Sequence, residues 1–170
     1  MGNFKSSNPF SFSDNLLNRI NKKWFLITSG DLSNYNMMTA SWGMFGILWN
    51  KPVAQVFIRP SRYTFEYVNK NDFFSICFFE DSYKDILQLL GSKSGRDFNK
   101  MHIDRLSPIN YQDKTIFFKE ASEILILKKL LVIPLDSSRI TTDVKEDFYK
   151  ENDFHFIFLA QIVDYLTKNY

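Results

Sequence analysis

Apolar and polar residues alternate along this chain in short runs that indicate mainly β structure. Several segments are rich in β-branched and aromatic residues and end at Gly, Pro, Asn or Asp, which is typical of strands bounded by turns. The predicted strands cover residues 24–29, 38–48, 53–58, 73–79, 116–118, 123–133 and 154–165. We expect the second of these strands to bend or bulge at Gly43 and Gly46. The leucine-rich segment 123–133 also fits a helix, so that alternative stays open.

Short segments between these strands predict helices. The first is capped by Ser13 or Asp14 and runs through Ile20, and the others are residues 62–69, 83–90 and 96–105. Ser61 is placed to cap the second helix, and Gly91 to end the third. Residues 1–13 are predicted to form a loose N-terminal arm. Many short strands with a few short helices favour a mainly β fold, a β-barrel with short helical insertions, and we expect residues 1–170 to form a single domain.

The composition supports a β-rich core and excludes several function classes. Of the 170 residues 18 are Phe, and aromatic side chains bury large areas and favour strands. A formal net charge of +2 is too balanced for a nucleic-acid-binding or membrane-binding surface, although it allows a local basic site. Because we find neither a signal peptide nor a run of about 20 apolar residues, we expect a soluble cytoplasmic protein.

The cysteine and histidine content argues against metal and thiol chemistry. Cys77 lies in an apolar run, fits a small core residue, and cannot form an intramolecular disulfide. Since His102 and His155 are the only histidines, we expect no metal site. The chain also lacks a G-x-G-x-x-G dinucleotide motif, a Walker sequence and an identifiable Ser–His–Asp set.

Two neighbouring stretches carry the polar groups that suit a ligand. Residues 36–43 read Asn-Met-Met-Thr-Ala-Ser-Trp-Gly, which places small polar groups next to a flat indole ring. Residues 59–64 read Arg-Pro-Ser-Arg-Tyr-Thr, where a helix N-terminus and arginine side chains would attract an anion. Together they suit a ligand with a planar ring at one end and an anion at the other. Each stretch alone also fits a structural role, either a strand with a buried Trp42 or a helix start with solvated arginines.

Five segments of the chain resemble motifs of the flavin reductase-like family. The first is N-x-M-T-A-S-W-G from Asn36, followed by W-x-K-P from Trp49 and R-P-S-R-Y-T-F-E-Y from Arg59. The segment Ser94–Lys100 is similar to S-G-R-D-x-D-K, with Asn99 where an Asp is usual. The segment Phe148–His155 is similar to F-Y-x-x-x-D-x-H before an apolar strand.

This resemblance implies an FMN-binding split β-barrel of the Greek-key, six-stranded type that forms a homodimer. It also implies which residues hold FMN: Asn36, Met37, Met38, Thr39, Ala40, Ser41 and Trp42 at the ring, and Arg59, Ser61, Arg62, Thr64, Ser94, Gly95, Arg96 and Lys100 toward the phosphate. The change to Asn99 leaves open how Lys100 is oriented. His155 is a candidate to reach the flavin or the nicotinamide, with a purely structural role as the alternative, and no other residue is assigned to catalysis.

The function that the resemblance implies is an NAD(P)H-dependent flavin reductase, in which a hydride passes from nicotinamide to N5 of FMN. Such a transfer needs alignment and a tuned ring rather than an acid or nucleophile from the protein. Two alternatives stay open. One is a flavoredoxin-like electron carrier with tightly bound FMN and an electron-donor protein as partner, and the other is an FMN-binding protein without turnover.

Overall fold

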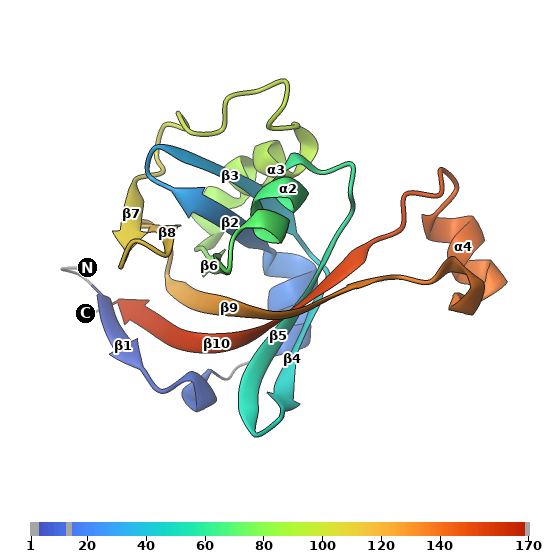
Figure 1. Cartoon of the computed structure of the whole chain (residues 1–170). Coiled ribbons are helices and arrows are strands. Elements are labelled where there is room, and N and C mark those ends of the chain that lie inside the picture. Colours follow the sequence, from blue (N-terminus) through green and yellow to red (C-terminus); the bar gives the residue numbers. More distant parts are fainter. Residues whose placement is uncertain (1–3, 13–14, 169–170) are drawn as a thin grey trace.

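Ten strands and four short α-helices form a mainly antiparallel β fold in the computed structural model, which describes residues 4–12 and 15–168 (Figure 1). The strands of the main sheet are β1 (Phe4–Ser7), β2 (Phe25–Asp31), β3 (Asn34–Ala40), β4 (Gly43–Leu48), β5 (Lys51–Ile58), β6 (Phe73–Phe78), β9 (Glu123–Pro134) and β10 (Phe156–Lys168). Their order is β3-β2-β6-β9-β10-β5-β4, with β1 paired to β10. The strands β7 (Pro108–Tyr111) and β8 (Thr115–Phe118) form a separate hairpin. The predicted fold class is confirmed, with eight strands in the main sheet where a six-stranded type was expected.

The helices are short and lie at the ends of strands. They are α1 (Leu16–Asn18), which continues into a π-helical turn at Arg19–Lys23, α2 (Tyr63–Lys70), α3 (Lys84–Ser92) and α4 (Thr142–Phe148). The caps predicted for the first helix, Ser13 and Asp14, lie outside the described residues, and the side chain of Asn15 caps α1. Short 3-10 turns occur at Pro9–Ser11, Asp81–Tyr83 and Ser137–Arg139. Helices α2 and α3 pack beside β2 and β3, whereas α4 stands away from the sheet between the ends of β9 and β10 (Figure 1). Within the described part of the chain, no helix is long and apolar enough to cross a membrane.

The central strands bury both of their faces, in two separate hydrophobic clusters. Along β9, Leu125 and Leu127 point into one cluster, while Ile124 and Ile126 point into the other. The first cluster is lined by β2, β5, β6 and β10, and the second is covered by α3 and the β7–β8 hairpin. A strand with two buried faces has no polar face, so its sequence is a continuous apolar run. This explains the leucine-rich stretch in β9, and the strand prediction there is confirmed against the helix alternative.

The prediction of a loose arm is wrong for the part of residues 1–13 that the structure describes. Residues Phe4–Ser7 form strand β1, which pairs with Tyr165–Lys168 of β10. The ring of Phe4 is buried and packs edge-on against Phe117, with 5.5 Å between the ring centroids. Phe12 packs against the first cluster. Burial of these two aromatic rings holds the segment against the sheet.

The helix predicted over residues 96–105 is absent, and this segment is a series of turns. The carbonyl of Ser94 accepts hydrogen bonds from the backbone N–H groups of Asp97 and Phe98, which closes a single turn. The Asn99 side chain then accepts from the N–H of Met101, and the hydroxyl of Tyr35 donates to the carbonyl of Met101. Hydrogen bonds between side chains and the backbone here replace those of a helix.

Three smaller predictions also differ from the structure. The single strand expected over residues 38–48 is two strands. Ser41 and Trp42 connect β3 to β4 and belong to neither strand. Gly91 lies inside α3, which ends one residue later at Ser92 and is closed by the N–H of Lys93 bonding to the carbonyl of Leu89. Strand β7 and helix α4 were not predicted.

Candidate functional site

One pocket, beside the connection between β3 and β4, brings the segments 38–42 and 59–62 together with His155. The pocket has a volume of about 200 Å³. Its lining residues come from the end of β3, from β5 and the turn after it, and from the residue before β10: Met38, Thr39, Ala40, Ser41, Trp42, Phe57, Arg59, Arg62 and His155. We refer to this site as the Trp42 pocket.

Trp42 forms a partly exposed aromatic wall of this pocket. Its side chain is 44% exposed, so the alternative of an ordinary buried strand tryptophan is wrong. The indole packs edge-on against Phe148, with 5.6 Å between the ring centroids, and lies 5.1 Å from the imidazole of His155. The wall therefore combines a residue from the β3–β4 connection with two residues from the segment between β9 and β10.

Arg59 joins this segment to the sheet. Its Nη2 donates to the carbonyl oxygen of Phe148 over 2.8 Å, and its Nε donates to Nε2 of His155 over 3.4 Å. The guanidinium also lies over the ring of Tyr149, 5.4 Å from the centroid. Because its guanidinium contacts Phe148, Tyr149 and His155, Arg59 fixes the segment around α4 at the pocket.

Two further positive charges lie nearby, Arg62 beside Arg59 and Lys100 beside Arg62. Nη2 of Arg62 donates to the carbonyl of Gly91 over 2.8 Å, at the C-terminal end of α3. Burial lowers the pKa of Arg62, and the charge of Arg59 lowers it further. Burial, and then the charge of Arg62, lowers the pKa of Lys100 to about 8. None of the three has a carboxylate within ion-pair distance among the described residues, so a bound anion would offset a charge that the protein leaves uncompensated.

His155 is held as a neutral ring. Because arginine can only donate, Nε2 of His155 is an acceptor, and Nδ1 carries the proton and donates to the hydroxyl of Tyr149 over 2.9 Å. Burial and, secondly, the charge of Arg59 lower the pKa of His155 to about 4, against an opposing effect of Asp153. The imidazole of the free protein is therefore uncharged at neutral pH, which suits a role in shaping the pocket.

The N-terminus of α2 lies next to the Trp42 pocket, because its N-cap residue lines that pocket. Arg62 is the N-cap, and the helix has no side-chain cap. The expected cap, Ser61, instead donates its hydroxyl to Asp153 over 2.5 Å, so that prediction is wrong. Inside the first turn Thr64 is buried and accepts a 2.8 Å hydrogen bond from the amide of Asn36. The N–H groups of Tyr63 and Thr64 have no acceptor within the helix, so this end of α2 adds partial positive charge to the site.

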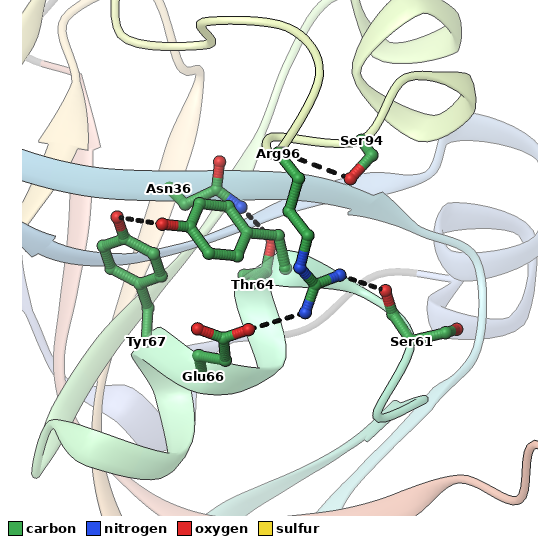
Figure 2. Close-up of polar contacts among 8 residues, drawn as sticks. Asn36, Ser61, Thr64, Glu66, Tyr67, Ser94 and Arg96 are labelled. Atoms are coloured by element: carbon green, nitrogen blue, oxygen red, sulfur yellow. Dashed lines mark hydrogen bonds and ion pairs between the residues drawn. The ribbon is translucent and has the colours of Figure 1, made fainter.

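The loop after α3 packs against this helix end. The backbone N–H of Arg96 donates to the Ser94 hydroxyl, and its guanidinium donates to the carbonyl of Ser61 over 2.7 Å and pairs with Glu66 over 2.6 Å (Figure 2). A Cβ atom on Gly95 would lie 2.3 Å from Oδ1 of Asn36. Only glycine lets the loop approach this closely.

The predicted cofactor residues therefore divide between two neighbouring places. Seven line the Trp42 pocket: Met38, Thr39, Ala40, Ser41, Trp42, Arg59 and Arg62. Asn36, Gly95, Arg96 and Lys100 line a second hollow of about 290 Å³ beside Tyr63. Met37 and Thr64 are buried, whereas Ser61 and Ser94 lie at the helix end and the loop.

Sequence reasoning missed Phe57, Phe148 and Tyr149 as parts of the site. Phe57 lies on β5, and nothing in the sequence around it indicates a functional residue. The other two belong to the F-Y pair of a motif noted in the sequence, and that motif was the available signal for them.

The low pKa of His155 predicts a stability loss in mild acid. The folded-state pKa of about 4 lies below the unfolded value of about 6.5, so the unfolded chain binds more protons between these values. The free energy of unfolding should fall as pH drops from 6.5 to 4, with about 3 kcal/mol of the loss due to this group. Urea unfolding at several pH values measures it. His155→Gln cannot titrate and should show a shallower loss, and an equal slope in both proteins would contradict the assignment.

The close approach of Gly95 predicts a steric penalty on substitution. Gly95→Ala places a methyl group against Asn36 and Tyr63, and Asn36 is held by Thr64, so the loop has to shift. The free energy of unfolding should fall by about 1–3 kcal/mol. Gly46→Ala is the matched control, because no atom lies within 4 Å of its Cβ position, and it should change stability by less than about 0.5 kcal/mol. Equal effects of the two substitutions would refute the close packing.

Comparisons with known proteins place the chain in a family. A model of the flavin reductase like domain matches residues 17–169. No curated protein sequence matches the chain.

Solved structures share its fold at low sequence identity. A flavoredoxin from Methanosarcina acetivorans has a TM-score of 0.68 at 19% identity, over 86% of this chain and 69% of the other. An FMN-binding protein from Thermus thermophilus with bound p-hydroxybenzaldehyde has a TM-score of 0.65 at 21% identity, over 86% and 71%. An NADH:FAD oxidoreductase of Streptomyces globisporus C-1027, solved with NAD and FAD fragments, has a TM-score of 0.61 at 14% identity, over 86% and 74%. The split-barrel fold is thereby confirmed, and the chain belongs to the flavin reductase-like domain family.

Proposed function

We propose that this protein binds FMN in and beside the Trp42 pocket and acts as an NAD(P)H-dependent flavin reductase. The observation that carries the proposal is the set of three cations, Arg59, Arg62 and Lys100, without a carboxylate partner in the described chain. The two arginines line the same pocket as the exposed indole of Trp42. A planar ring that ends in a phosphate dianion matches that arrangement. Membership of the flavin reductase-like family supports the same ligand class.

The end of β3 offers the hydrogen bonds that a flavin ring requires. β3 is the last strand in the sheet order, so one edge of its backbone has no strand partner. Ser41 and Trp42 leave the ladder, which adds backbone groups that are not used in pairing. Such groups hold a ring in place, and the electrostatics around the ring tune its electronics. A bound flavin would supply the hydride acceptor at N5, and the protein would supply alignment and exclusion of water.

The phosphate of FMN would lie toward Arg62 and the N-terminus of α2. Arg62 has donors left after its single bond to the carbonyl of Gly91, and the first turn of α2 presents N–H groups. Phosphate contacts from arginine and helix amides are charge-assisted, and they are absent for riboflavin. The donor set therefore favours FMN over the nucleoside-like flavin without phosphate.

An electron carrier is the second candidate. Trp42 and Phe148 are both partly exposed at the pocket, so a protein partner could approach the ring edge directly. The similarity to the flavoredoxin from Methanosarcina acetivorans concerns the fold and is compatible with either function.

Anaerobic mixing of the FMN-loaded protein with NADH or NADPH tests the two candidates. A reductase should bleach the flavin absorbance within seconds, because the nicotinamide can align with the ring. A carrier should remain oxidised with both nicotinamides and be reduced by a small reduced electron-transfer protein. Bound FMN that neither donor reduces would contradict both.

Removal of Arg62 should weaken FMN specifically. Arg62→Ala should cost about 1.5–3 kcal/mol in FMN binding, the range for a hydrogen bond to a charged group. Riboflavin affinity should be nearly unchanged, since only the phosphate contact is lost. Arg105→Ala, which removes an exposed arginine paired with Asp85, serves as the control and should leave both affinities unchanged. An equal loss for FMN and riboflavin in a fluorescence titration would refute the phosphate assignment.

A homodimer is the proposed assembly. Large apolar side chains are exposed on edge strand β4 and its turn, on the outer half of β9 and on α4: Trp42, Met44, Ile47, Leu48, Trp49, Leu131, Ile133, Val144 and Phe148. A second copy of the chain would cover them, with the flavin beside the interface.

Disruption of this apolar surface should separate the copies. Trp49→Asp places a charge on the exposed turn after β4 and should shift the molar mass measured by light scattering from dimer to monomer. Leu32→Asp, on the exposed turn after β2, should leave the dimer intact. If FMN binds only the dimer, it should also favour the dimer on dilution by mass action. A monomer that binds FMN as tightly as the dimer would rule out a shared site.

A further inference from the structure

Lys100 is a buried cation that is held by backbone carbonyls instead of an acid. Its side chain is 3% exposed, and its Nζ donates to the carbonyls of Met37 over 2.9 Å and Leu90 over 2.8 Å. A buried ammonium is costly unless it is paired and hydrogen-bonded, and most buried lysines have an acidic partner. The residue before it, Asn99, is neutral, and its side-chain oxygen accepts from the N–H of Met101. The chain therefore keeps a full positive charge here at an energetic cost.

The position of Lys100 links three elements that form the site. Met37 lies on β3 within the ring-binding stretch, and Leu90 lies in the last turn of α3. The next carbonyl along α3, that of Gly91, accepts the bond from Arg62. Two cations thus share the C-terminal end of one helix, where the helix dipole favours positive charge. Arg62 lines the Trp42 pocket, whereas Lys100 does not.

We propose that Lys100 is a positioning residue for the phosphate of the bound flavin, acting through β3 and Arg62 without touching the ligand. It fixes β3 against α3 and adds a positive charge behind Arg62 that attracts a dianion. This inference rests on the proposed function. It differs from the direct cofactor contact that the family resemblance implies for Lys100, because the ammonium points at two carbonyls.

The charge of Lys100 makes a pH dependence of phosphate binding measurable. Burial, with a second contribution from Arg62, lowers the pKa of Lys100 to about 8. The charged group that acts on the ammonium is Arg62, the N-cap of α2. Tyr35 of β3 and Arg96 and Asp97 of its own loop line the same hollow as Lys100, whereas Lys93 at the end of α3 is exposed. A bound dianion favours the charged form and raises this pKa. By linkage, FMN binds best below pH 8 and loses affinity as pH rises through the pKa of the liganded state.

The experiment compares FMN with riboflavin at constant ionic strength. Dissociation constants for both flavins are measured by fluorescence quenching from pH 7 to about pH 9.5, and their ratio gives the phosphate preference. The FMN phosphate is already a dianion over this range, because its second pKa is about 6. For a pKa rise of one unit in the complex, the preference should fall about tenfold across the range.

Three variants separate charge from structure. Lys100→Met should show the reduced preference at every pH. Lys100→Arg keeps a charge that does not titrate below pH 12 and should hold the high preference throughout. Lys93→Met removes an exposed lysine at the end of α3 and should follow the wild type. Thermal melting of each variant establishes that it is folded.

The outcomes are distinguishable. A preference for FMN that is flat with pH in the wild type, or is retained in full by Lys100→Met, would overturn the role of Lys100 and leave the phosphate site standing. Equal binding of FMN and riboflavin at every pH would overturn the proposed phosphate site and this inference with it. Where the Lys100 variants do not fold, titration of the 13Cε resonance of Lys100 in the wild type tests the proposal instead. Its midpoint should lie near pH 8 in the free protein and rise with FMN but not with riboflavin.

Discussion

Burial of the central strands on both faces is the constraint on which the rest of the structure depends. β2, β6 and β9 present side chains to two hydrophobic clusters at once, so both sides of this part of the sheet need a cover. On one side the sheet curves over its own strands, and on the other α3 and the β7–β8 hairpin provide the cover. β3 is thereby pinned between β2 and α3, and the hydroxyl of Thr39 donates to the carbonyl of Leu87 in α3. The stretch 36–40, which is proposed to bind the ring, is therefore held by packed secondary structure, and such support gives a site precise geometry.

The second constraint is electrostatic. The charge of Arg59 acts on Arg62, and that of Arg62 acts on Lys100. Among the described residues, the hydrogen-bond acceptors of all three cations are neutral: carbonyls and the imidazole of His155. Such an arrangement costs stability in the free protein, and binding of the proposed phosphate would recover that cost. The depressed pKa values of Lys100 and His155 follow from the same burial and the same positive field. The hydrophobic core is unaffected by the unfavourable charges, because the three cations lie at the edge of the sheet and outside the two clusters.

The sequence predicts those parts of the molecule whose signal is local. The aromatic and β-branched runs predict the long strands, and the motif stretches predict that residues 38–42, 59–62 and 155 form a site. β1 could not be predicted, because its partner β10 lies about 160 residues away and only the packing of Phe4 reveals the pairing. The turns of residues 96–105 depend on tertiary hydrogen bonds from Tyr35 and Lys100, which override local helix preference. The orientation of Lys100 has the same origin, since its acceptors belong to β3 and α3.

Arg59 and Arg62 are three residues apart, yet their surroundings assign them different tasks. Arg59 donates to Phe148 and His155 and lies over Tyr149, so it is committed to the segment that carries α4. No residue of α4 is buried, and contacts from Arg59, Ser61 and Trp42 hold this segment beside the pocket. If Arg59 turned to an anion, those contacts would weaken and the aromatic wall would loosen. Arg62 has one carbonyl acceptor and can add a phosphate without such a loss. The geometry therefore leaves Arg62 available for the proposed phosphate, whereas Arg59 fixes the aromatic wall against which a planar ring would lie.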